Sequence, residues 1–236
     1  MSKSKILVVG GTGYIGKRVV KASLDQGHPT YVLMRRELGF EIEKLQMLLS
    51  FKKQGAHLIE GSFSDHQSLV DAVKQVDVVI CTMSGVQFRS HNILLQLKLV
   101  DAIKEAGNIK VVKTSCFMDE DDVATYTIKT IDDPRMLNKT LYLRPDENIV
   151  TQNQLVEKWE KVSGVTLRRE HISKEDFLAS MKLDMDEAIR AALARIYHIF
   201  YEGCMMNFEI EEGEEASKLY PEVRYTRMDE YLARYL

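Results

Sequence analysis

The sequence predicts an α/β fold: a doubly wound parallel sheet with a smaller, mostly helical C-terminal lobe. Short apolar runs alternate with helical patterns over the first 117 residues, a glycine-rich turn follows the first run, and the alternation stops after Phe117. A chain of 236 residues, 45% of them hydrophobic, can bury a sizeable core. We therefore expect two domains, residues 1–117 and 118–236.

Composition excludes several classes of function. The net charge of −3 gives no electrostatic footprint for nucleic acid. No apolar run approaches the roughly 18 residues of a membrane span. A glycine-rich turn follows the first apolar run, where a secretory signal would need a small-residue cleavage site. The three cysteines and six histidines lack metal-ligand spacing, and the odd number of cysteines suits a reducing cytosol. We expect a cytoplasmic protein with no membrane, nucleic-acid or metal partner.

Five apolar runs predict the strands of the N-terminal sheet. Two are Val/Ile runs with little alternation, as expected when helices cover both faces of a parallel sheet. The clearest helical pattern can be capped by Ser90 and ended by Gly107. The expected strands are 5–10, 30–34, 57–60, 76–82 and 109–115, and the expected helices are 14–26, 41–54, 67–73 and 90–106.

The second half of the chain is helical with isolated strands. Its acidic cluster, residues 119–122, is expected to cap a helix rather than bind a metal. Thr151 and Gln154 have the spacing of a capping box, and the helix that they begin carries an apolar stripe expected to be buried. The expected helices are 119–131, 151–163, 174–183, 185–201 and one from 228, with strands at 140–144, 167–172 and 207–211.

One motif carries recognisable chemistry, and it lies between the first strand and the first helix. It reads Gly10-Gly11-Thr12-Gly13-Tyr14-Ile15-Gly16. Gly10 permits a tight turn, Gly13 lets the backbone approach a pyrophosphate at the helix N-terminus, and Gly16 lets the helix pack closely on the sheet. A tight turn without a ligand is the alternative, but the βα repeats that follow favour a Rossmann-type dinucleotide site with these seven residues as contacts.

The end of the second strand predicts which dinucleotide binds. NAD sites usually carry an acid there, whereas this chain has Arg35, whose guanidinium can hold a 2′-phosphate that an acid would repel. Lys44 is placed to add a second positive charge; the alternative is that both are ordinary surface cations. Ser84 and Gly85, after the fourth strand, are small enough for the backbone to approach ribose and nicotinamide; the alternative is a plain loop. The two cations, Arg35 and Lys44, favour NADP(H) over NAD(H).

Six blocks of the sequence, which together span nearly the whole chain, resemble one family. They are residues 10–16, 27–33, 99–110, 119–134, 137–145 and 219–225. They are similar to the plant NADPH-dependent reductases that include pinoresinol–lariciresinol reductase, phenylcoumaran benzylic ether reductase and isoflavone reductase, which are NmrA-like atypical short-chain dehydrogenases. The resemblance implies that residues 1–117 are an NADP-binding domain and that residues 118–236 are a substrate-side lobe.

The same resemblance implies roles for individual residues. Gly10, Gly13 and Gly16 would hold the pyrophosphate of NADPH, and Arg35 and Lys44 its 2′-phosphate. The family reduces benzylic ethers of lignans and related phenolics: a lysine general base helps to open the ether, and NADPH delivers hydride to the benzylic carbon. The resemblance implies a phenolic small-molecule substrate, and a homodimer is left open as the assembly.

The chain departs from the family at that lysine. In the family, the fifth strand leads into an Arg-Phe-Leu-Pro-Ser-Glu-Phe-Gly-type motif and then into a helix that carries the lysine. In this chain, Phe117 is followed directly by Met118 and the acidic helix. The resemblance therefore implies that a large internal segment is missing, and residues 115–117 align with either side of the gap. Lys113 is a candidate replacement base, with an ordinary surface lysine as the alternative.

His198 lies in an aromatic stretch that borders the substrate pocket in the family, so it is a candidate substrate contact, with a partly buried structural histidine as the alternative. We therefore expect an NADPH-dependent reductase of lignan or isoflavonoid-type phenolics with weak or absent turnover. A non-catalytic NADP-binding regulator of the NmrA-like kind is the second hypothesis. The third is a product that does not fold, since uncovering one face of the sheet would cost on the order of 10 kcal/mol.

Overall fold

The structure, a computed structural model, describes residues 3–35, 42–83, 98–99, 101–103, 105, 118–170, 172–182, 185–202, 210 and 213–236. The chain divides into two compact units, Met1–Lys113 with Asp119–Leu141 and Thr114–Met118 with Tyr142–Leu236. The strand expected at 109–115 and the domain boundary expected after Phe117 lie outside the described residues, as does all of the strand expected at 207–211 except Ile210.

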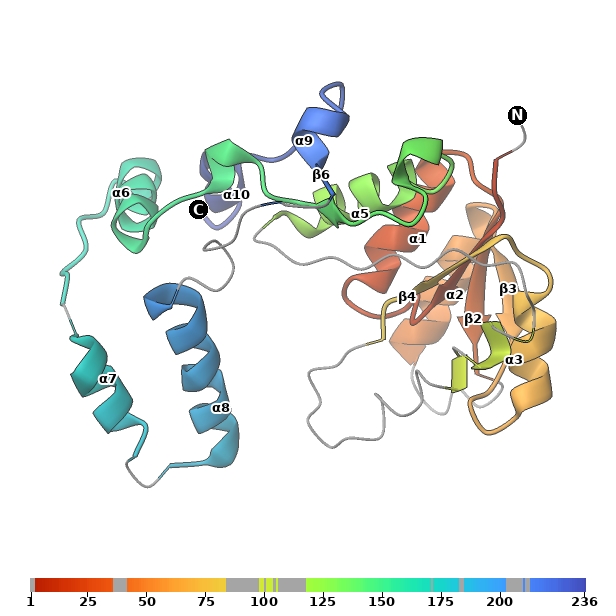
Figure 1. The fold of residues 1–236 in the computed structure, drawn as a ribbon, viewed down its shortest axis with the longest axis horizontal. Coiled ribbons are helices and arrows are strands. Elements are labelled where there is room, and N and C mark those ends of the chain that lie inside the picture. Colours follow the sequence, from red (N-terminus) through yellow and green to blue (C-terminus); the bar gives the residue numbers. More distant parts are fainter. Residues whose placement is uncertain are drawn as a thin grey trace. The chain divides into compact units, whose positions relative to one another are not determined.

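The first unit contains a four-stranded parallel sheet in the order β3-β2-β1-β4 (Figure 1). Strand β1 (Ile6–Val9) pairs with β2 (Thr30–Met34) on one side and with β4 (Val78–Cys81) on the other. Strand β3 (His57–Glu60) pairs with β2. The chain thus crosses from one side of β1 to the other after β3, as in doubly wound sheets. The predicted α/β fold class is confirmed.

Strand β1 is the centre of this unit because its side chains are buried on both faces. Ile6 and Val8 pack into one hydrophobic cluster, and Leu7 and Val9 pack into another. The alternation follows from the two-residue period of a strand, and none of the four side chains is more than 2% exposed. The apolar run of β1 therefore reflects helical cover on both faces.

Three helices cover the face of Ile6 and Val8: α1 (Gly16–Asp25), α2 (Ile42–Lys53) and α5 (Glu120–Lys129). On the other face lie α3 (His66–Val73) and the helical residues around Leu99. The first cluster contains Val19, Val20, Leu48, Phe51, Ala124 and Ile128. Both faces of the sheet are thus covered by helices, as the unbroken apolar runs predict.

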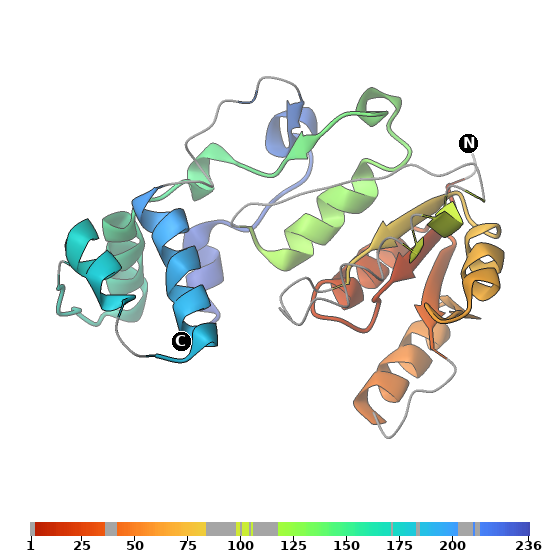
Figure 2. The ribbon, with the colours of Figure 1, turned by 60° about the horizontal axis from the view of Figure 1, so that its bottom comes forward.

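Helix α5 packs within the first unit, although the sequence analysis placed it in the second domain. It lies against α1 (Figure 2), and its residues Ala124 and Ile128 enter the cluster formed with that helix. The side chain of Asp119 caps α5 by accepting a hydrogen bond from the Asp121 N–H at 2.8 Å, as the acidic cluster predicts. The chain after the junction at Phe117 therefore completes a core that the chain before it begins.

The second unit consists of short elements. They are β5 (Leu141–Tyr142), α6 (Gln152–Ser163), α7 (Lys174–Ser180), α8 (Glu187–Ile196), β6 (Glu214–Glu215), α9 (Ala216–Leu219) and α10 (Met228–Ala233), with a 3-10 turn at Asp146–Asn148 and a π-helical turn at Tyr197–Tyr201. A further 3-10 turn, Pro134–Met136, follows α5 in the first unit. β5 begins at the last residue of the first unit and pairs with β6. None of the helices in the described ranges is long and apolar enough to cross a membrane.

The predicted capping box begins α6. The Thr151 hydroxyl accepts from the Gln154 N–H at 3.2 Å, and the Gln154 side-chain oxygen accepts from the Thr151 N–H at 2.8 Å. The prediction of a buried face on α6 is wrong, because none of the residues of this helix is buried. Its apolar stripe is only half-buried, and among the described elements the helix that packs on α6 is the short α10.

The strand predicted at 167–172 is also wrong, because its described residues form no strand. Glu160 of α6 explains the difference: its carboxylate accepts from the Leu167 N–H at 2.9 Å and from the Arg169 guanidinium at 2.6 Å. A side chain thereby satisfies a backbone donor that would otherwise need a neighbouring strand.

Replacing a core residue of α5 tests whether this helix is part of the first unit. Ile128→Ala is expected to lower the free energy of unfolding by about 2–4 kcal/mol, because the side chain is 1% exposed and packs among residues of α1. Ile42→Ala on α2, where the side chain is 67% exposed, is the control and should change it by less than about 0.5 kcal/mol. Urea unfolding measures both. Equal small losses would contradict the packing of α5 on α1.

Candidate functional site

The glycine-rich turn leaves β1 at the carboxyl edge of the sheet and winds directly into α1. Gly10 has a φ of +84°, in the left-handed region that favours glycine. Its carbonyl accepts a hydrogen bond from the Gly13 N–H at 2.9 Å, and the Gly13 carbonyl accepts one from the Lys17 N–H at 3.0 Å. The turn is therefore a continuous hydrogen-bonded path from strand to helix, with Gly13 exposed at its outer side.

Two of the glycines allow contacts that no other residue would permit. A Cβ on Gly16 would lie 2.0 Å from the carbonyl oxygen of Gly10 and 2.7 Å from the hydroxyl oxygen of Thr82. A Cβ on Gly11 would lie 2.8 Å from Cγ1 of Val32 in β2. Thr82, directly after β4, donates its hydroxyl to the Val9 carbonyl at 2.9 Å. The turn is thus packed against the ends of β1, β2 and β4.

The outer side of the turn fits the pyrophosphate of a dinucleotide. Ile15 precedes α1 and supplies no side-chain cap, so no side chain occupies the N-terminal end of the helix in that role. A Cβ on Gly13 would meet a single atom, the Gly10 carbonyl oxygen, at 3.1 Å, which leaves the backbone open to close approach. Backbone N–H groups at a helix N-terminus are the usual partners of phosphate oxygens.

Tyr14 and Arg18 connect this turn to α5. The Tyr14 hydroxyl donates to the Glu120 carboxylate at 2.8 Å. The Arg18 guanidinium donates to the Tyr14 carbonyl at 2.8 Å, its Cζ lies 4.4 Å from the centroid of the Tyr14 ring, and its Nε lies 3.1 Å from an Asp121 carboxylate oxygen. Sequence reasoning missed these contacts because Tyr14 and Glu120 are 106 residues apart, and the acids already had a local role as a helix cap.

The cations predicted to select NADP lie near the same edge of the sheet. Arg35 directly follows β2 and is exposed, and Lys44 is half-buried in the first turn of α2. Because β2 is the parallel neighbour of β1, its end and the glycine turn share the carboxyl edge of the sheet. Ser84, Gly85 and Lys113, the remaining candidates of this unit, lie outside the described residues.

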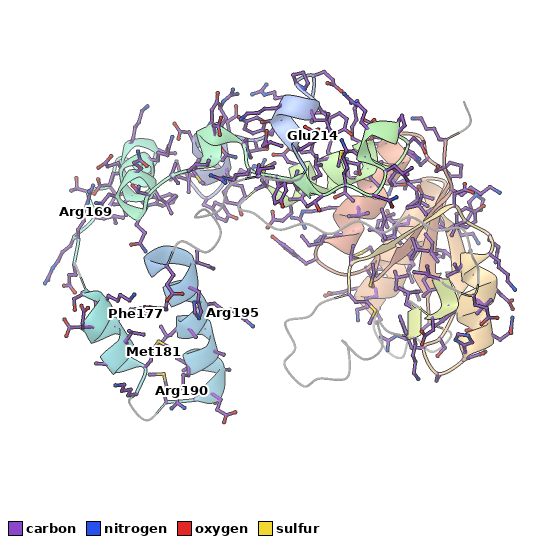
Figure 3. All side chains as sticks on the ribbon, viewed as in Figure 1. Arg169, Phe177, Met181, Arg190, Arg195 and Glu214 are labelled. Carbon is purple, nitrogen blue, oxygen red and sulfur yellow. The ribbon has the colours of Figure 1, made fainter. Side chains whose placement is uncertain are left out.

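His198 belongs to the second unit and lies in the π-helical turn. Its Nδ1 is 2.6 Å from a Glu202 carboxylate oxygen, and this hydrogen bond holds the pKa of Glu202 below its usual value. The neighbouring Tyr197 is buried and stacks on Phe177 of α7 (Figure 3), with the ring centroids 6.3 Å apart. A hydrogen bond with Tyr197 raises the pKa of Lys174. His198 itself is exposed, which differs from a partly buried structural histidine.

The parallel sheet and the glycine-rich turn after β1 define a Rossmann-type α/β protein. The family model for the NmrA-like family matches residues 2–117 and 110–232. The chain therefore belongs to the NmrA-like family.

Curated relatives narrow the comparison within that family. The chain is 52% identical to an isoflavone reductase homolog of Lupinus albus and 49% identical to a bifunctional pinoresinol-lariciresinol reductase of Sinopodophyllum hexandrum, in alignments that cover all of both chains. A solved structure described as AtPrR2 with NADP+ and (+)pinoresinol has a TM-score of 0.91 and 44% identity, and an isoflavone reductase has a TM-score of 0.86 and 28% identity, both over the whole of each chain. The resemblance stated from the sequence is confirmed.

The alignments also reveal a gap. The alignment with the Lupinus albus protein spans 313 positions and this chain has 236 residues, so at least 77 aligned positions contain no residue of this chain. The family model matches in two pieces, and both pieces include residues 110–117. Because of this overlap, residues 115–117 can still be aligned with the family either before the missing segment or after it.

Adding one methyl group to the turn tests its packing. Gly16→Ala is expected to lower the free energy of unfolding by about 3 kcal/mol or more, because the new Cβ would overlap the Gly10 carbonyl oxygen, which is backbone and cannot rotate away. Gly13→Ala is the matched control in the same turn and should cost about 1 kcal/mol, since its Cβ would meet one atom at 3.1 Å. Urea titration of both variants measures the difference, and equal losses would contradict the geometry.

Proposed function

We propose that this chain is by descent an NADPH-dependent reductase of lignan or isoflavonoid-type phenolics, and that it binds NADPH on the turn of residues 10–16. The observation that carries the proposal is the fit of that turn to a pyrophosphate, in an NmrA-like chain about half identical to pinoresinol-lariciresinol reductases. The structure most like it among those compared above is described with NADP+ and (+)pinoresinol. The parallel sheet order, with β1 at the crossover, supports a nucleotide at this edge.

Each candidate residue has a role in this proposal. Backbone N–H groups of the turn hold the pyrophosphate, and Arg35 and Lys44 hold the 2′-phosphate through charge-assisted hydrogen bonds. Ser84 and Gly85 allow the backbone to approach the ribose and nicotinamide. When bound, NADPH supplies a hydride for a benzylic carbon of the substrate. His198, in the second unit, is proposed as a contact of the phenolic substrate.

We further propose that turnover is weak or absent. The resemblance implies that the lysine general base of these reductases belongs to the segment missing here. The size of the gap supports this, because at least 77 aligned positions contain no residue of this chain. A positioned general base typically contributes about 10²–10⁴-fold to a rate. Lys113 is the candidate replacement. The protein is proposed to work in the reducing cytosol, in keeping with the free thiol of Cys81.

A non-catalytic NADP-binding regulator is the second candidate function. The gap in the alignments favours this function, because a chain can lose the segment proposed to hold the general base and still keep its nucleotide contacts. The residues proposed to hold the pyrophosphate and the 2′-phosphate all precede residue 110, where the second matched piece begins. Co-purification of a protein whose association changes with the redox state of NADP would support this function. Detectable turnover without such a partner would support the reductase.

Removing the guanidinium after β2 tests the choice of nucleotide. Arg35→Ala is expected to raise the Kd for NADPH about 30-fold, because a bidentate charged contact to the 2′-phosphate is lost. The Kd for NADH should change less than about twofold, since NADH has no 2′-phosphate to contact. Calorimetric titration measures both, with Lys21→Ala on α1, whose ammonium lies 2.6 Å from Asp25, as a control cation. Equal losses for the two nucleotides would contradict the proposed role of Arg35.

Incubating the folded protein with NADPH and pinoresinol tests the proposed loss of turnover. A rate of about 0.1 per second or less is expected, because a typical enzyme turns over about 10 times per second and the general base is missing. The absorbance of NADPH follows the reaction. A rate near 10 per second would show that the lysine is not required.

Folding is checked first, by thermal unfolding of the same preparation. A cooperative melt would reject the third hypothesis, a product that does not fold, and a broad transition with aggregation would support it. Sequencing the transcript across the codons of Phe117 and Met118 establishes whether the shortened form is made.

A further inference from the structure

The glycine-rich turn is held by a helix from the other side of the gap. Tyr14 and Arg18 belong to the piece of the family model that matches residues 2–117, whereas Glu120 and Asp121 lie beyond residue 117, in the piece that matches 110–232. The contacts between them therefore join the two matched pieces directly at the turn.

Helix α5 is a fixed support for these contacts. Ala124 is fully buried and Ile128 is 1% exposed in the core cluster shared with α1. At its start, Asp119 caps the helix through the Asp121 N–H. Because the backbone of α5 is anchored at both points, the two carboxylates that directly follow the cap, those of Glu120 and Asp121, are presented to α1 in a defined position.

The contact with Arg18 sets the direction of one peptide group. The Arg18 guanidinium, half-buried between the Tyr14 ring and Asp121, donates to the Tyr14 carbonyl at 2.8 Å. That carbonyl and the Ile15 N–H belong to the same planar trans peptide group, so fixing the carbonyl points the N–H in the opposite direction. Ile15 immediately precedes α1, where backbone N–H groups bind phosphate.

We propose that Glu120 and Asp121 are positioning residues for nucleotide binding. Acting through Tyr14 and Arg18, they hold the peptide group between Tyr14 and Ile15 in the orientation that receives the pyrophosphate. The nucleotide site thereby includes a helix that follows the missing segment, and the gap leaves this support intact. The inference rests on the proposed function, since it needs NADPH on the turn.

Three variants separate the steps of this support. Arg18→Met removes the bond to the Tyr14 carbonyl and should raise the Kd for NADPH about tenfold. Asp121→Asn keeps the shape of the side chain but removes its charge, and should raise the Kd about threefold, because the carboxylate is 67% exposed and screened. Tyr14→Phe loses the hydroxyl contact with Glu120 but keeps the ring over Arg18, and should raise the Kd about twofold.

The matched control is Asp25→Asn on α1, the helix that also carries Arg18. Asp25 also pairs with a cation of α1, Lys21, at 2.6 Å, but does so in the last turn, away from the glycines. Its substitution should leave the Kd unchanged. Calorimetric titration with NADPH and with NADH gives a second comparison. Each of the three variants should raise the Kd for NADPH and the Kd for NADH by equal factors, because both nucleotides contain the pyrophosphate. Arg35→Ala, by contrast, should affect mainly NADPH.

Coupling between residues distinguishes positioning from general destabilisation. If Asp121 acts through Arg18, adding Asp121→Asn to Arg18→Met should leave the Kd at the value of Arg18→Met alone. A lowered Tm with an unchanged Kd in all three variants, while the unsubstituted protein binds NADPH, would overturn the inference and leave the proposed function standing. Absence of binding by the folded, unsubstituted protein would overturn the proposed function, and this inference with it.

Discussion

The whole first unit depends on a close approach between two backbone segments, the end of β1 and the start of α1. The Gly10 carbonyl occupies the space that a Cβ on Gly16 would need, only 2.0 Å away. Because Gly16 has no Cβ, α1 can lie close to β1 and bury Val19 and Val20 against Ile6 and Val8. The same approach leaves the N-terminal end of α1 at the carboxyl edge of the sheet, so a steric condition of the core also creates the candidate site.

How much could be predicted from the sequence depended on how local the determining interactions are. The glycine turn, the Asp119 cap and the Thr151–Gln154 capping box span a few residues each, so their patterns were visible. The contact of Tyr14 with Glu120 was not visible, because it joins residues 106 positions apart. Nor was the bond of the Leu167 N–H to the Glu160 side chain, because no short motif indicates that a carboxylate of the preceding helix takes the place of a neighbouring strand. The buried face expected on α6 failed for a related reason: an apolar stripe indicates amphipathicity but not how completely a partner covers it.

The gap in the alignments affects the two parts of the proposed function differently: nucleotide binding is proposed to be kept, and proton transfer to be lost. The residues proposed to bind the nucleotide lie before residue 110, and the helix proposed to support them lies after residue 117. The resemblance implies that the lysine general base of the reductases belongs to the segment between these positions. Loss of an internal segment can therefore separate cofactor recognition from chemistry within one chain, because the two functions occupy different stretches of sequence.

The packing of α5 on α1 also affects how the chain is made. These helices are about a hundred residues apart in sequence, yet they share one core cluster, and the Ser4 hydroxyl donates to Asp132 just beyond α5. During synthesis the nascent N-terminal sheet must wait with one face partly uncovered until α5 has left the ribosome, which at about 5–20 residues per second takes several seconds. That interval is when exposed apolar surface makes the growing chain most dependent on chaperones.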